Sequence, residues 1–473
     1  MRNARSLIPL FGLTMLAGCT VGPDFVRPTP ALPVAWQANG SAAPPAPAKA
    51  QWWRAFGDPV LDALEEKAAT ANLDVRIALE RIEAARATRG LAKAEAAPTL
   101  SGQASYSRER IGTEGVAALA APLLGLQSVA QSPKGIDFNL YSVGAGASWE
   151  LDLWGKHRRQ IESAQATLEA TAAEARGVRL SIQAEVAHGY FQLRGLWAER
   201  KLAAERQALA AQAVAVATTL NSRGLATPID VAEAQSRDRQ IRDDLSDLDD
   251  QAARASRVLA VLTGSDPDAQ PVEPSVVYTL PVPAAAAVQL PSELAHNRPD
   301  IVAAEAQLHA ATAAIGVAQA EFYPSINLTG LFSLDALNLD DLGWNARNTS
   351  IGPSLSLPIF DGGRIRRQIA LRASQQRSAA LSYQQTVRGA WREVDDALGI
   401  VRTLQTRTTL ADAELQARQR TVAALEARFS RGDIAAVPVL DARAALIAAD
   451  TAHLQLRVAA LLARVQLQRA LGG

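Results

Sequence analysis

Four segments of the chain alternate between apolar and polar residues with a period of two. They cover residues 98–110, 140–153, 324–335 and 350–359. In each segment one face is rich in Leu, Ile, Val, Ala and aromatic residues, and the other in Ser, Gly, Thr and Asn. This pattern predicts half-buried β-strands of about 10 to 13 residues, the length of tilted transmembrane strands. A soluble antiparallel sheet with one face on a core is the alternative, although its second face would normally carry Lys and Glu.

Four strands are too few to close a membrane barrel, which needs about eight. Because open strand edges are not stable in lipid, the chain is expected to pool its strands with identical copies around an axis. Two, three or four copies would satisfy this requirement, and strand spacing does not choose among them. The aromatic residues at the predicted strand ends are placed as in an aromatic girdle: Trp149, Trp154, Phe322, Tyr323 and Phe360. Residues 111–131 and 336–347 are predicted loops on the outer side.

Long segments rich in Ala, Gln, Arg and Glu, and free of proline, follow the second and fourth strands. They predict helices over residues 157–221 and 365–430, each about 100 Å long. Gly224 and Gly432 follow these helices as C-cap glycines. The remaining predicted helices cover residues 58–96, 228–262, 292–321 and 438–471. Taken without the strands, the long helices are also compatible with a structural coiled coil.

The order helix, strand, strand, long helix, turn, helix occurs twice. The two pseudo-repeats are predicted over residues 52–264 and 292–473, and a linker rich in Pro and Ala over residues 265–291 joins them. Ser222-Arg223-Gly224 of the first turn corresponds to Ser430-Arg431-Gly432 of the second. The sequence therefore predicts one pseudo-symmetric α+β membrane protein.

The N-terminal residues 1–18 are typical of a lipoprotein signal peptide. A basic start with Arg2 and Arg5 precedes a short apolar segment, and Leu16-Ala17-Gly18-Cys19 forms a lipobox. Cys19 is the single cysteine of the chain and is expected to carry the lipid, with a buried structural cysteine as the alternative. Residues 19–51 would then form a lipidated tether, and Thr20, in place of Asp, favours sorting to the outer membrane. We expect no apolar segment after Cys19 that approaches the roughly 18 residues of a membrane helix.

Composition and motifs argue against several other functions. The 48 basic and 48 acidic residues give no net charge, which argues against a nucleic-acid partner. The histidines show no metal-ligand spacing, and no nucleophile elbow, phosphate loop or dinucleotide motif occurs. The carboxylates are expected on helix faces that contact water. We therefore expect no enzyme activity and no cofactor other than the covalent lipid on Cys19.

The chain resembles the TolC-like outer-membrane factors of tripartite efflux pumps, and most closely their OprM-like lipoprotein branch. The resemblance spans essentially the whole chain and rests on the segments 19–25, 52–59, 297–301, 322–330 and 360–364. It implies a homotrimer in the Gram-negative outer membrane with a 12-stranded β-barrel, four strands per chain, continuous with a long periplasmic α-helical barrel. It also implies passive conduction of drugs and other toxic small molecules from a periplasmic adaptor and an inner-membrane RND transporter to the exterior.

The resemblance further implies a periplasmic gate at the two repeat turns. Asp441 matches the acidic position nearest the axis, Val437 an apolar constriction, and Asp230 an acidic latch residue. Phe429 and Ile434 stand where the TolC pattern has the tyrosine and arginine of that latch, and Phe429 cannot donate a hydrogen bond. Helix capping is the alternative role of both aspartates, with Asp441 in a first helical turn. The adaptor is expected to contact the turns through Arg223, Gly224, Arg431 and Gly432.

Two other functions stay open at this point. One is the exit channel of an ABC-driven type I protein-secretion system. The other is a lipid-anchored structural coiled coil without a pore, which the strand alternation disfavours.

Overall fold

The computed structural model describes residues 20–29, 51–111, 136–273, 280–281 and 297–473. The predicted signal peptide, Cys19, most of the tether and nearly all of the predicted loop over residues 111–131 lie outside these residues. The chain divides into two compact units. Unit 1 consists of residues 1–26, 85–168 and 307–379, and unit 2 of residues 27–84, 169–306 and 380–473. Each unit thus takes segments from both halves of the sequence.

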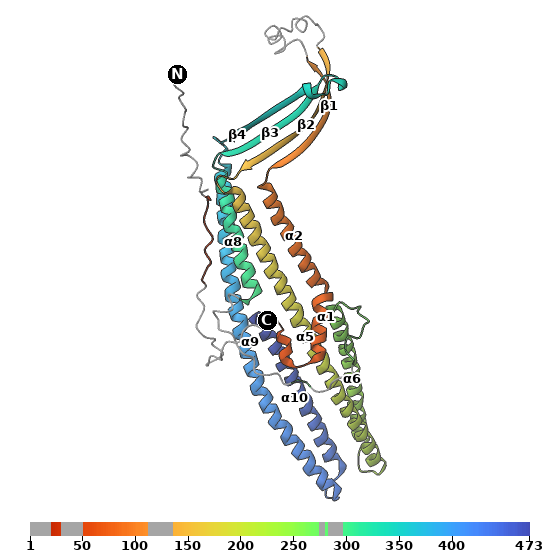
Figure 1. Ribbon diagram of the computed structural model, residues 1–473. Coiled ribbons are helices and arrows are strands. Elements are labelled where there is room, and N and C mark those ends of the chain that lie inside the picture. Colours follow the sequence, from red (N-terminus) through yellow and green to blue (C-terminus); the bar gives the residue numbers. More distant parts are fainter. Residues whose placement is uncertain (1–19, 30–50, 112–135, 274–279, 282–296) are drawn as a thin grey trace, which may run out of the picture. The chain divides into compact units, whose positions relative to one another are not determined.

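Unit 1 contains one antiparallel sheet in the order β1-β2-β3-β4 (Figure 1). The strands are β1 (Thr99–Ile111), β2 (Ile136–Leu151), β3 (Ser325–Ala336) and β4 (Arg347–Ser356). β2 begins before the predicted residue 140, and β4 lies three residues earlier than the predicted 350–359. β4 contains Pro353, which an edge strand tolerates, and it ends at Ser356.

The strand register places the apolar positions of all four strands on one face. Ala104 lies opposite Val143, Val143 opposite Leu334, and Leu334 opposite Arg347. Large apolar side chains on this face are exposed, with Leu100 at 79% and Ile351 at 84% of full exposure. A soluble sheet would bury this face against a core.

Most of the remaining structure is helical. The two longest helices, α5 (Lys156–Ser222) and α9 (Arg364–Ser430), have 67 residues each. Their lack of proline and their strong helix formers account for this length. The shorter helices are α1 (Pro59–Ala71), α2 (Leu73–Glu95), α6 (Pro228–Leu262), α8 (Pro299–Ala320) and α10 (Ala436–Leu471), with the 3₁₀ turns η1 (Trp52–Phe56), η2 (Leu339–Asp341) and η3 (Trp344–Ala346).

The single helix predicted over residues 58–96 is wrong, because Asn72 divides it into α1 and α2. The Asn72 backbone is extended, with ψ at 130°. Its side chain accepts hydrogen bonds from the N–H groups of Asp74 and Val75 and donates to the carbonyl of Leu262 at 2.9 Å. Asn72 therefore caps the start of α2 and ties it to the end of α6.

Unit 2 has its main core around aromatic residues of η1 and α5. Trp52, Trp53, Phe56, Tyr190 and Phe191 are all buried in this cluster. Two described linker residues, Val272 and Leu280, belong to the same cluster. The linker therefore packs on the core of unit 2 at these two points.

Two helices are long and apolar enough to cross a membrane by length and composition alone, contrary to the sequence-based expectation. They are α8 and α10, and half of the apolar window of α8 is buried within the protein. α10 makes polar contacts with α9, including an ion pair of Arg443 with Glu426 at 2.6 Å and a contact of His453 with Asp412 at 2.7 Å. These features are those of helices that pack on other helices.

Candidate functional site

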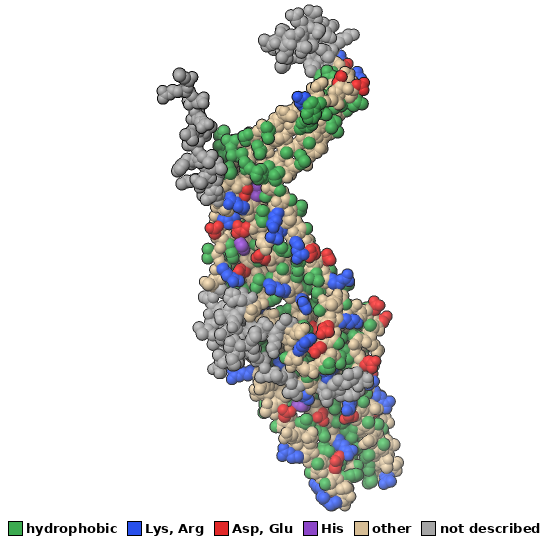
Figure 2. Space-filling model, in the orientation of Figure 1, with side chains coloured by type: hydrophobic (Ala, Val, Ile, Leu, Met, Phe, Trp, Pro, Cys, Tyr) green, Lys and Arg blue, Asp and Glu red, His purple; other side chains and the backbone are tan. Residues whose placement is uncertain are grey.

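The first functional feature is the sheet of unit 1, whose two outer strands each have one strand neighbour among the described residues. Within these residues β1 pairs with β2 alone, and β4 pairs with β3 alone. The surface of the sheet in Figure 2 is largely uncharged, and charged side chains gather near the end where β1 stops. In a membrane barrel the open edges of such a sheet pair with other strands, and the exposed apolar face contacts lipid.

The opposite face of the sheet is mainly polar, although Phe138, Leu140 and Leu331 also lie on it. It carries the side chains of Thr99, Ser101, Gln103, Ser142, Ser148, Asn327, Thr329, Ser333 and Ser354, among others. Asp335 lies on this face and accepts hydrogen bonds from Ser142 at 2.5 Å and from Asn348 at 2.6 Å. A face of hydroxyl and amide groups suits contact with water inside a barrel.

Aromatic side chains gather where the strands join the helices of unit 1. Trp154 donates through Nε1 to the carbonyl of Pro324 at 2.8 Å and stacks on Tyr323. Trp149 donates to the carbonyl of Ala96 at 3.0 Å. Because each indole is apolar with one polar atom, this arrangement fits a membrane–water interface.

The two repeat turns have the same backbone structure. Gly224 and Gly432 adopt left-handed conformations with φ of 71° and 80°. After α5, the N–H of Gly224 donates to the carbonyl of Asn221, and the N–H of Leu225 to that of Leu220. After α9, the N–H of Gly432 donates in the same way to the carbonyl of Phe429, and the N–H of Asp433 to that of Arg428. Both turns are therefore Schellman motifs, in which glycine carries the left-handed conformation without strain.

Asp230 takes part in a capping box at the start of α6. Its N–H donates to the Thr227 hydroxyl at 3.3 Å, and its carboxylate accepts from the Thr227 N–H at 2.7 Å and hydroxyl at 2.8 Å. These hydrogen bonds from Thr227 lower the pKa of the Asp230 carboxyl. Asp230 thus caps α6, whatever further role it has.

Asp441 does not cap a helix. α10 begins at Ala436, two residues before the predicted start, so Asp441 lies in the second turn rather than the first. The first turn of α10 has no acidic residue. Asp441 is exposed, as are Val437 four residues earlier and Phe429 at the end of α9. The capping interpretation of Asp441 is therefore wrong.

Charged residues surround the second turn. Arg431 donates to Asp433 at 3.1 Å within the turn, and Arg443 pairs with Glu426 between α10 and α9. In the first turn, Arg223 is exposed. The predicted adaptor-contact residues are therefore accessible on this chain.

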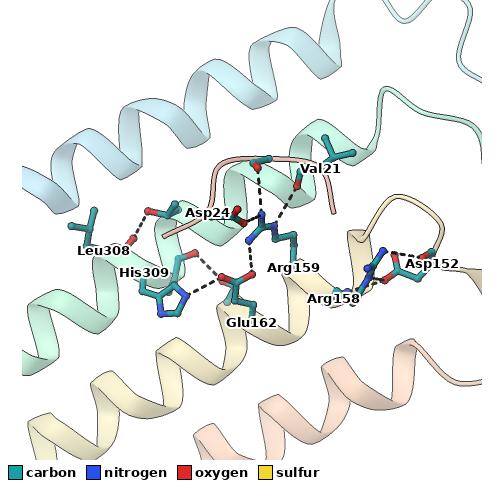
Figure 3. Close-up of polar contacts among 12 residues, drawn as sticks. Val21, Asp24, Asp152, Arg158, Arg159, Glu162, Leu308 and His309 are labelled. Carbon is teal, nitrogen blue, oxygen red and sulfur yellow. Dashed lines mark hydrogen bonds and ion pairs between the residues drawn. The ribbon is translucent and has the colours of Figure 1, made fainter. Parts of the chain in front are cut away.

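The residues that directly follow Cys19 lie across α5 and α8 in unit 1 (Figure 3). Arg159 of α5 is buried, and its guanidinium donates to the carbonyls of Val21 and Gly22 at 3.3 Å and to Asp24 at 2.6 Å. It also pairs with Glu162 at 2.7 Å. A single arginine therefore fixes three residues of the extended segment.

Close packing and a stacked ring complete this attachment. A Cβ atom on Gly22 would lie 2.4 Å from Cα of Gly316, so the segment contacts α8 directly. Phe25 stacks on His309 of α8 with ring centroids 4.4 Å apart, and His309 lies 2.9 Å from Glu162. Cys19 itself is outside the described residues, but the chain beside it is held where β2 leads into α5.

Sequence reasoning missed a buried polar cluster in unit 2. Asp58 caps α1 by accepting from Val60 N–H at 3.0 Å, accepts from the Tyr190 hydroxyl at 2.9 Å and forms an ion pair with Arg194. All three side chains are buried. Burial raises the pKa of the Tyr190 hydroxyl, which therefore stays protonated and donates. The only sequence signal was the Asp-Pro pair that is typical of a helix start.

Glu65 contradicts the expectation that the helical carboxylates face water. Its side chain is fully buried, and neither carboxyl oxygen has a hydrogen-bond partner among the described residues. Burial raises the pKa of Glu65 to about 9, with Asp62 adding to the shift and Arg179 opposing it. Glu65 is therefore a neutral acid at pH 7.

The chain is similar over almost its full length to known outer-membrane proteins. A family model described as outer membrane efflux protein matches residues 64–265 and 290–473. The chain is 33% identical over 478 residues to outer membrane protein OprJ of Pseudomonas aeruginosa, covering 98% of this chain and 96% of OprJ. It is 30% identical over 471 residues to the pyoverdine export outer membrane protein OpmQ of that organism, covering 100% and 97%. The solved structure of the outer-membrane channel OprN matches with a TM-score of 0.84 and 30% identity over 96% of this chain and 99% of OprN.

Proposed function

Because this chain belongs to the outer membrane efflux protein family, we propose that it is the exit channel of a tripartite efflux system. Members of the family are transport proteins of the outer membrane rather than enzymes. In our proposal the channel passively conducts drugs and other toxic small molecules from a periplasmic adaptor and an inner-membrane RND transporter to the exterior. The name of OpmQ, a pyoverdine export outer membrane protein, supports efflux as the purpose.

The observation that carries the proposal is the four-stranded sheet, whose two outer edges and two faces are left uncovered by the residues that the structure describes. Three copies would pair β4 of one chain with β1 of the next and so close a barrel of twelve strands. The apolar face would contact lipid and the polar face would line the pore. The helices of the three chains would form a periplasmic helical barrel, and a lipid on Cys19 would anchor each chain at the membrane.

The repeat turns are the proposed contact sites of the adaptor. A photo-crosslinking residue at Arg223 or Arg431 is expected to capture the adaptor in cells, because both side chains are exposed beside the Schellman glycines. The same residue at Leu339 in η2 is the control, and it should capture no periplasmic protein. Recovery of a proton-driven transporter with the adaptor supports efflux. Recovery of an ATP-driven exporter would instead indicate protein secretion, and no periplasmic capture would argue against docking at the turns.

The three copies of Asp441 in the trimer are the proposed acidic ring of the gate. Asp441→Ala is expected to raise the leak conductance of the isolated trimer in a planar bilayer at least about two-fold, because three carboxylates leave the narrowest ring of the closed entrance. Asp244→Ala is a matched control that should leave the conductance unchanged. Asp244 is an exposed carboxylate in the middle of α6, where it pairs with Arg206 of α5. Equal conductance of Asp441→Ala and wild type would contradict this role.

A further inference from the structure

The basic side chains at the outer end of the sheet lie on its apolar face. They are Arg108, Arg110 and Arg347, and Asp137 lies on the same face opposite Arg110. Glu109 and Asp335 lie on the polar face. Among the described strand residues, the polar face carries no Lys or Arg. An anion that approaches this end of the sheet therefore meets cations only on the apolar face.

Arg108 stands directly beyond the apolar part of β1. Tyr106, two residues earlier on the same face, packs against Tyr141 of β2 with ring centroids 4.9 Å apart. Arg108 is exposed. The neighbouring Arg110 faces Asp137 at 3.8 Å, so part of its charge is already balanced within the sheet. Of the arginines of β1, Arg108 is therefore the one that we expect to bind an anion from outside the protein.

Arg347 has a similar setting at the start of β4. Its guanidinium lies 5.3 Å from the ring centroid of Trp344 and donates to the carbonyl of that residue at 2.9 Å. Trp344 also approaches Phe332, with ring centroids 6.0 Å apart. These contacts hold the Arg347 stem in place while the residue stays exposed. Each hairpin end therefore has an aromatic pair beside an exposed arginine on the apolar face.

An apolar surface that ends in aromatic rings and then in arginines fits one kind of partner. Acyl chains would cover the apolar side chains, rings would lie at the interface, and guanidinium groups would bind phosphate through paired N–H donors. The cost of an arginine on a lipid-facing strand is also smallest near the interface. We propose that Arg108 and Arg347 each bind a phosphate group of the acylated glycolipid in the outer leaflet of the membrane. This proposal rests on the proposed function, because it requires the apolar face to contact lipid.

The test uses the full-length protein, purified and delipidated in detergent, with lipid A as the probe. Binding of lipid A that retains both phosphates is compared with binding of dephosphorylated lipid A by native mass spectrometry. Wild type is expected to prefer the phosphorylated form at least about tenfold, and the double variant Arg108→Gln, Arg347→Gln to lose that preference. Arg364→Gln is the matched control, since this exposed arginine follows the other end of β4 and should keep the preference.

The lipid-binding and conductance results together separate this proposal from the proposed function. Equal binding of both lipids by wild type would overturn the phosphate site, as would an unchanged preference in the double variant. Trimer size and single-channel conductance are measured on the same preparations. A conducting trimer without phosphate preference refutes the lipid site alone, whereas failure to form a conducting trimer refutes the channel and the lipid site with it.

Discussion

Asp58→Ala is expected to destabilise unit 2 by about 3–5 kcal/mol, the cost of removing one partner of a buried ion pair. The variant removes the N-cap of α1, the acceptor of the Tyr190 hydroxyl and the counter-charge of Arg194 at once. Arg194 would remain as a buried cation, which is the largest part of the cost. The free energy of unfolding is measured by circular dichroism during urea titration of the detergent-solubilised protein.

Two further variants separate the effect of losing the buried ion pair from the effect of substituting a charged residue in general. Arg54→Ala removes one partner of an exposed pair with Glu66, for which a change below about 1 kcal/mol is expected. Adding Arg194→Met to Asp58→Ala removes both buried charges and should recover part of the lost stability. The single variant Arg194→Met is measured as well. If the double variant loses as much free energy of unfolding as Asp58→Ala and Arg194→Met lose together, the assigned ion pair is contradicted.

The sequence predicts the regular elements because each depends on local patterning. Alternation of apolar and polar residues places the four strands, and the absence of proline predicts the two long helices nearly to their ends. Gly224 and Gly432 are predicted as C-caps because left-handed backbone favours glycine. The family assigned from short motifs is confirmed by the match to outer membrane efflux proteins.

The features that the sequence did not predict depend on contacts between distant segments. Asn72 ends α1 by bonding to Leu262, and a continuous helical pattern around it conceals the break. Arg159 holds residues 21–24 across more than 130 positions of sequence, which no periodicity indicates. Helix α10 begins two residues early, and this small shift decides that Asp441 does not cap the helix.

The burial of Glu65 is another feature that the sequence pattern does not predict, because a glutamate in a helix usually faces water.

The burial of Glu65 is also expected to make the free energy of unfolding depend strongly on pH. The pKa of Glu65 is about 9 in the folded protein, against 4.5 for an unperturbed glutamate. Between these values the unfolded chain has lost the proton and the folded chain retains it, so stability falls as the pH rises. From this group alone the fall is about 1.4 kcal/mol per pH unit.

Glu65→Gln is expected to remove this contribution, because an amide does not ionise in this range. Between pH 6 and pH 8 the free energy of unfolding of the variant should gain about 3 kcal/mol relative to wild type. Any packing cost of the amide is the same at both pH values and cancels from this difference. Glu66→Gln changes the next residue, an exposed carboxylate, and its difference from wild type should stay constant. Parallel pH profiles for wild type and Glu65→Gln would mean that Glu65 ionises in the folded protein, which requires a buried cation or water beside it.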